Sequence, residues 1–125
     1  MHAASPKGFA AVARDHADAP LDLHRLMVPH PAATFFMRMR GDSMRPRLRK
    51  GDLLVVDRSR DPLPGRLVVA AVNGEHLVRR WERDPSGEGA LLLAEDPKHP
   101  PIRTAEVPDF AVFGVVTWVA SPCSP

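Results

Sequence analysis

Short apolar runs follow one another from residue 34 to the C-terminal end of the chain and predict β-strands. Each run is bounded by Gly, Pro or Asp, and the six runs are Thr34–Met39, Leu53–Asp57, Arg66–Val72, His76–Glu82, Ala90–Ala94 and Phe110–Val119. Asn73 and Gly74 separate two of them, and this dipeptide is typical of a type I′ turn, which needs positive φ at both positions. The pattern predicts a mainly β protein, a small, curled, antiparallel β domain with a short helix.

The N-terminal part has a different pattern. Residues 1–20 are rich in Ala, Asp, His and Pro without a clear period, so we interpret them as a flexible arm. Asp22 can then cap a short helical turn before the first strand. We expect an arm at 1–20, one domain at 21–120 and a C-terminal tail at 121–125.

The composition agrees with one globular domain. The chain has 125 residues, of which 44% are hydrophobic and 26% are charged, enough for a single core. One cysteine, Cys123, cannot form an internal disulfide, and no apolar run approaches the roughly 20 residues of a membrane helix. We therefore expect a cytoplasmic protein with no membrane partner.

Basic residues gather in one part of the sequence although the formal net charge is only +2. They are Arg38, Arg40, Arg45, Arg47, Arg49 and Lys50. Because no aromatic residues interleave with them for base stacking, we interpret them as solvated strand edges and expect no direct DNA binding. A patch for nucleic-acid phosphates is the alternative.

Two short stretches carry the candidate chemistry, Gly41-Asp42-Ser43-Met44 and Gly74 to Arg80. A serine in a tight turn is a candidate nucleophile, but its hydroxyl needs an adjacent base to remove the proton. The hairpin register places Leu77, Arg79 and Trp81 on one face of the second stretch.

These stretches, and others in the same order, resemble the self-cleaving domain of LexA-like proteins, serine peptidases with a Ser/Lys dyad. The resemblance is strongest to the UmuD branch, which assists translesion DNA polymerases in the SOS response. The matching runs are Leu21–Leu23, His30–Phe36, Gly41–Met44, Gly51–Asp57, Val68–Glu75 and Val112–Val116.

The resemblance implies a role for each residue of the site. Ser43 takes the nucleophile position, and the backbone N–H groups of Asp42 and Ser43 take the oxyanion-donor position. The base position holds Arg79 instead of lysine, and a guanidinium keeps its proton at any useful pH. We therefore predict no self-cleavage, with Arg79 holding Asp42 or a backbone carbonyl across the cleft. We expect no cofactor and no metal, because no second His or Cys lies at ligand spacing.

The resemblance also implies a cleavage-site position and partners. The corresponding bond is Lys7-Gly8, and because only seven residues precede Gly8 the chain resembles the processed form. The implied function is that of an accessory subunit for error-prone DNA synthesis, with a Y-family polymerase and a RecA filament as partners. A homodimer is expected through the last strand, at Phe113, Val115, Val116 and Trp118.

Two alternatives remain from the residues. The first is an active autoprotease that uses another base, among His30, His76, His99, Lys50 and Lys98. The second is the dimerisation domain of a LexA-like repressor.

Overall fold

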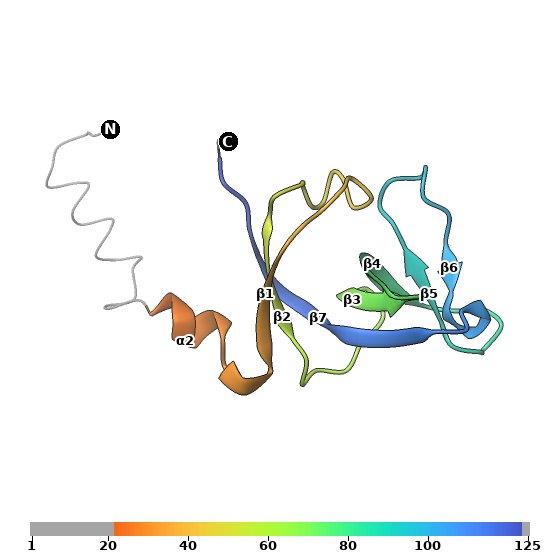
Figure 1. The fold of residues 1–125 in the computed structure, drawn as a ribbon, viewed down its shortest axis with the longest axis horizontal. Coiled ribbons are helices and arrows are strands. Elements are labelled where there is room, and N and C mark those ends of the chain that lie inside the picture. Colours follow the sequence, from red (N-terminus) through yellow and green to blue (C-terminus); the bar gives the residue numbers. More distant parts are fainter. Residues whose placement is uncertain (1–21, 124–125) are drawn as a thin grey trace, which may run out of the picture.

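A seven-stranded antiparallel sheet frames the protein, in the strand order β1-β2-β7-β3-β4-β5-β6 (Figure 1). The computed structural model describes residues 22–123. The strands are β1 (Thr34–Arg38), β2 (Leu53–Asp57), β3 (Leu67–Val72), β4 (Glu75–Arg83), β5 (Ala90–Leu93), β6 (Ile102–Arg103) and β7 (Phe110–Ala120). The helical elements are α2 (Leu23–Met27) and the 3-10 turns η1 (Pro31–Ala33) and η2 (Thr104–Glu106).

The six predicted strands are all present, each with ends within one residue of the prediction. The predicted mainly β fold is confirmed. Strand β6 was not predicted, because two residues are too few to show an alternating pattern.

The β3–β4 hairpin confirms the turn predicted at Asn73 and Gly74, whose φ angles are 49° and 85°. Its register places Leu77 opposite Ala70 and Arg79 opposite Val68. Strand β5 pairs with β4 only from Arg80 to Arg83. Within the described residues, the segment from Glu75 to Arg79 therefore has no strand on its second edge.

Two apolar clusters form the core. One includes Met44, Leu54 and Val69, and the other includes Val68, Ala70, Leu92 and Val115. Neighbouring residues of β3 belong to different clusters, so this strand is buried on both faces.

Strand β7 lies between β2 and β3 in the middle of the sheet, which explains its apolar sequence. Val115 is 1% exposed and Val116 8% exposed, so their side chains lie in the chain's own core. Of the four residues expected at a dimer interface, Trp118 is exposed and Phe113 is half-buried.

The N-terminal side of the described region begins with the predicted cap, since Asp22 Oδ1 accepts a hydrogen bond from the Arg25 N–H at 3.2 Å. Residues 1–21 and 124–125 lie outside the described part, and with them the predicted arm, the end of the tail and the Lys7-Gly8 bond. No helix between residues 22 and 123 is long and apolar enough to cross a membrane.

Candidate functional site

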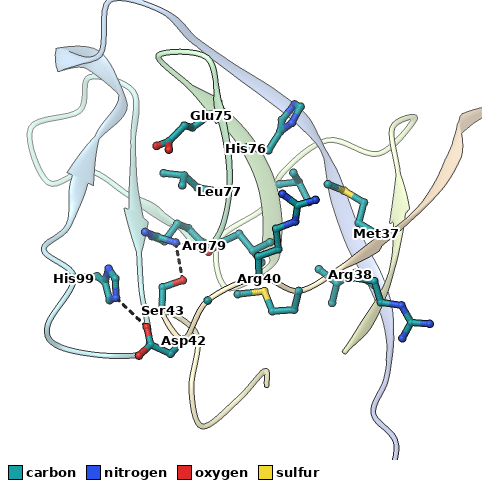
Figure 2. A pocket seen from close by; sticks show the side chains of 15 residues that line it. Met37, Arg38, Arg40, Asp42, Ser43, Glu75, His76, Leu77, Arg79 and His99 are labelled. Atoms are coloured by element: carbon teal, nitrogen blue, oxygen red, sulfur yellow. Dashed lines mark hydrogen bonds and ion pairs between the residues drawn. The ribbon is translucent and has the colours of Figure 1, made fainter. Parts of the chain in front are cut away.

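A cleft of about 770 Å³ opens beside Ser43 (Figure 2). It lies between the end of β1 with the loop that follows and the first half of β4. The charged and polar residues of its lining are Arg38, Arg40, Asp42, Ser43, Glu75, His76, Arg79 and His99.

The turn at Ser43 is anchored from two sides. Gly41 has a φ of 73°, a backbone angle that residues with a Cβ rarely adopt, and it turns the chain just before Ser43. The Ser43 carbonyl accepts hydrogen bonds from the N–H groups of Glu95 at 3.0 Å and Asp96 at 2.9 Å. Met44, which follows, is fully buried. Ser43 is thus 8% exposed and held against β4.

Arg79 occupies the position beside the Ser43 hydroxyl, and it is only 7% exposed. Its Nη1 donates a hydrogen bond to Ser43 Oγ at 2.9 Å (Figure 2) and another to the Val78 carbonyl, also at 2.9 Å. Its Nε is buried without a hydrogen-bond partner in the described structure. Burial lowers the pKa of Arg79 below its ordinary value, because desolvation disfavours the charged form.

These contacts correct one part of the prediction for Arg79. The side chain does not hold Asp42, whose carboxylate instead lies 3.5 Å from His99 Nε2. The carbonyl that it does hold belongs to the preceding residue of its own strand. Because Arg79 donates to the serine oxygen, its polarity is opposite to that of a base, which must accept the serine proton.

The predicted oxyanion donors are the backbone N–H groups of Asp42 and Ser43. Within residues 22–123 neither group donates a hydrogen bond to another backbone atom, and their oxyanion role stays a prediction.

The five alternative bases are spread over the molecule. His76 and His99 line the cleft, and the His76 ring packs against Phe113 with 5.2 Å between centroids. His30 lies elsewhere, bound to Asp57. Lys50 and Lys98 are exposed outside the cleft lining.

Asp42, Asp96 and His99 lie together at the rim, with one potential ligand atom of each within 4.8 Å of the others. This grouping could not be predicted from the sequence, because Asp42 is distant in sequence from the other two. Exposed acidic groups often gather in this way without an ion, and the grouping alone identifies no metal site.

The basic run of residues 38–50 does not form one patch. Arg38 and Arg40 line the cleft, whereas Arg47 lies 3.7 Å from Glu95 and Arg49 donates to Ser121 at 3.1 Å. The structure thus places two of these arginines at the candidate site.

Sequence reasoning also missed a second polar cluster, at the end of β2. Asp57 is 2% exposed, and its carboxylate accepts hydrogen bonds from His30 Nδ1 at 2.8 Å and from the Ser59 N–H at 2.8 Å. The available signal was an Asp that ends an apolar strand just before a polar loop, since a buried carboxylate needs partners.

Known proteins are similar to this chain over most of its length. The family model described as Peptidase S24-like matches residues 3–117. Protein SamA of Salmonella typhimurium is 40% identical over 113 residues, 90% of this chain and 76% of SamA. Protein ImpA of Escherichia coli is 42% identical over 113 residues, 90% of this chain and 75% of ImpA. Protein MucA of Escherichia coli is 43% identical over 74 residues, 58% of this chain and 51% of MucA.

Proposed function

Since the chain belongs to the peptidase S24-like family and is a UmuD-type SOS mutagenesis protein, we propose that it is a cytoplasmic accessory subunit of an error-prone Y-family polymerase and that it does not cleave itself. The observation that carries the second half of this proposal is the hydrogen bond from Arg79 Nη1 to Ser43 Oγ at 2.9 Å.

The chemical argument concerns the direction of that hydrogen bond. A Ser/Lys peptidase needs a neutral amine that accepts the serine proton, and a buried lysine supplies it when desolvation lowers its pKa. Arg79 offers only N–H donors, and Nη1 already uses both of its hydrogens on Ser43 and Val78. Losing a general base typically lowers a rate by roughly 10²–10⁴-fold. The resulting protein keeps the fold and the serine but not the cleavage step.

The polymerase role is tested in cells that lack their own UmuD-type protein and its polymerase. The protein supplied together with a Y-family polymerase from the same genome should restore ultraviolet-induced reversion, whereas either one alone should not. Ser43→Ala should restore it as well as the wild type, because cleavage is not required. Failure of the pair, with both proteins present on a blot, would contradict the accessory role.

Self-cleavage is tested separately with activated RecA filament and at alkaline pH, by mass spectrometry of the intact chain. The mass should not change, and a Ser43-dependent cut near Lys7-Gly8 would contradict the proposal.

We also propose a homodimer that uses the exposed end of β7. The support is a row in register across β1, β2 and β7, in which the exposed aromatic side chains of Phe36 and Trp118 flank the buried Val55. These two aromatic side chains are 56% and 41% exposed. Two copies that face each other along this row would remove it from water.

Light scattering on two variants separates this interface from the core. Trp118→Asp should give a folded monomer, whereas Val115→Asp should unfold the chain because Val115 is buried. Ser43→Ala is the control that should leave the dimer mass unchanged. A wild-type protein that is monomeric at tens of micromolar would contradict the dimer.

One observation favours a second candidate, an autoprotease with a histidine base. His99 lines the same cleft as Ser43 and has Asp42 beside its Nε2. If His99 removed the serine proton, His99→Gln would abolish any cleavage seen in the mass measurement.

A further inference from the structure

Arg79 is a buried cation without a carboxylate partner. None of the ion pairs formed within residues 22–123 includes it, although the other buried charged residues, Asp52, Asp57 and Asp84, all accept hydrogen bonds. A buried charge is costly unless it is paired and hydrogen-bonded. Within residues 22–123, the Arg79 charge therefore has no anionic partner.

The cleft that Arg79 lines has the corresponding charge. Its lining contains three arginines, at positions 38, 40 and 79, and two carboxylates, Asp42 and Glu75. The Asp42 carboxylate lies 3.5 Å from His99 Nε2 at the rim of the cleft. The cleft therefore favours a negatively charged occupant.

The strands around the cleft favour a peptide over a small ion. Strand β1 is an edge strand of the sheet, and the segment from Glu75 to Arg79 has no β5 partner. Both segments therefore leave backbone groups unpaired within the described residues. Met37 and Leu77 add apolar surface to the same lining. Extended peptides bind such edges by backbone hydrogen bonds, while pockets select alternate side chains.

We propose that this cleft binds an extended acidic peptide segment of a partner protein, with one peptide carboxylate on the Arg79 guanidinium and the Ser43 hydroxyl. Ser43 Oγ accepts from Arg79, so its own hydrogen is free to donate to that carboxylate. The inference rests on the proposed loss of cleavage, because it assigns Arg79 to binding in the place of a base.

The test measures binding of a fluorescein-labelled peptide, Ala-Val-Glu-Val-Glu-Val-Ala, by fluorescence anisotropy. The same peptide with Gln for both Glu residues should bind about tenfold more weakly or worse, because charge-assisted pairs with Arg are the stronger ones. Arg79→Gln should weaken binding of the acidic peptide by about tenfold and leave the Gln peptide unchanged. Equal binding of both peptides, or no effect of Arg79→Gln, would overturn the proposal.

Two further variants serve as a control and as a second test of the cleft. Arg83→Gln removes the same charge from an exposed position of the same strand outside the cleft, and binding should stay within about twofold. Arg40→Gln changes an exposed cleft residue and should weaken the acidic peptide several-fold even if Arg79→Gln does not fold. No effect of Arg40→Gln in that case would count against the proposal.

Two further measurements are needed. The first distinguishes a peptide ligand from a small anion, and the second distinguishes failure of this inference from failure of the proposed function. Inorganic phosphate below about 1 mM should not displace the peptide, and displacement would identify a small-anion site instead. Mass spectrometry of a bound peptide that carries an Ala-Gly bond should show it intact. Cleavage there would contradict the proposed function, whereas loss of acidic selectivity would contradict only this inference.

Discussion

A serine hydroxyl lies beside a buried charge at the end of β2 and again in the cleft, but the two sites differ in how that charge is paired. At the end of β2, the Asp57 carboxylate accepts hydrogen bonds from Ser59, His30 and Arg60. In the cleft, Arg79 bonds to Ser43 and Val78, and no carboxylate of residues 22–123 pairs with it. The first charge is compensated within the chain and is structural, whereas the second is left for an external group.

The pKa shifts follow the same division. Burial by itself would raise the pKa of Asp57, but the hydrogen bonds from Ser59 and His30 outweigh it and hold the pKa well below its ordinary value. For Arg79, burial acts without a compensating partner and lowers the pKa. In both cases the direction of the pKa shift shows whether the surroundings favour the charged form of the side chain.

The largest expected effect comes from returning a titratable base to the cleft. Arg79→Lys should raise the rate of cutting a peptide with an Ala-Gly bond by about 10²–10⁴-fold, because a desolvated amine can take the Ser43 proton. Product is measured by chromatography.

Two controls belong to this experiment. Adding Ser43→Ala should remove the gained activity, and His30→Lys beside Ser59 should give none, since neither His30 nor Ser59 lines the cleft beside Ser43. An Arg79→Lys protein no faster than the wild type would mean that the oxyanion donors or the peptide groove are no longer competent.

Next in size is the loss of the compensated charge. Asp57→Asn should lower the free energy of unfolding by about 2 kcal/mol, because charge-assisted hydrogen bonds at a buried carboxylate are lost. Urea denaturation measures this. Asp61→Asn, at a nearby exposed position, should stay within about 0.5 kcal/mol of the wild type.

The uncompensated charge should behave differently. Arg79→Met should leave the free energy of unfolding unchanged or raise it by about 1 kcal/mol, because an apolar side chain avoids the desolvation cost of the cation. Arg83→Met serves as the control for denaturation of an exposed variant. A loss of about 2 kcal/mol or more would show that Arg79 has a compensating partner after all.

The smallest effect is the acid dependence of Asp57. The pKa of Asp57 is depressed in the folded state. Its contribution to the free energy of unfolding is therefore fully present when the pH is above its pKa in the unfolded chain, and it is lost as the pH falls toward the folded-state pKa. The stability difference between wild type and Asp57→Asn should therefore shrink between about pH 5 and pH 2. Asp52 and Asp84, whose pKa values are also lowered, are common to both proteins and cancel. A difference that is independent of pH in this range would contradict the assignment.

Local chemistry was enough to predict much of the fold. The apolar runs, the Asn73-Gly74 turn and the Asp22 cap depend on neighbours in sequence, and the structure contains each of them. The two-residue strand β6 was missed because its pairing with β5 comes from the sheet and not from its own pattern.

The candidate site divides in the same way. The family resemblance paired positions 43 and 79, and the residue types there predicted that a hydroxyl would meet a guanidinium and not an amine. Which atoms that guanidinium binds was decided by the tertiary structure, since β5 ends its pairing at Arg80 and the Ser43 turn is held by Glu95 and Asp96.

The burial of individual side chains could not be predicted from the sequence either. An apolar run such as Phe110 to Ala120 suits a core and an interface equally, and only the place of β7 between β2 and β3 buries Val115 while it leaves Trp118 exposed. The pairing of His30 with Asp57 also joins residues that are 27 positions apart. Composition and local pattern specify which groups are present, but the balance of a buried charge depends on distant residues that only folding brings within hydrogen-bond distance.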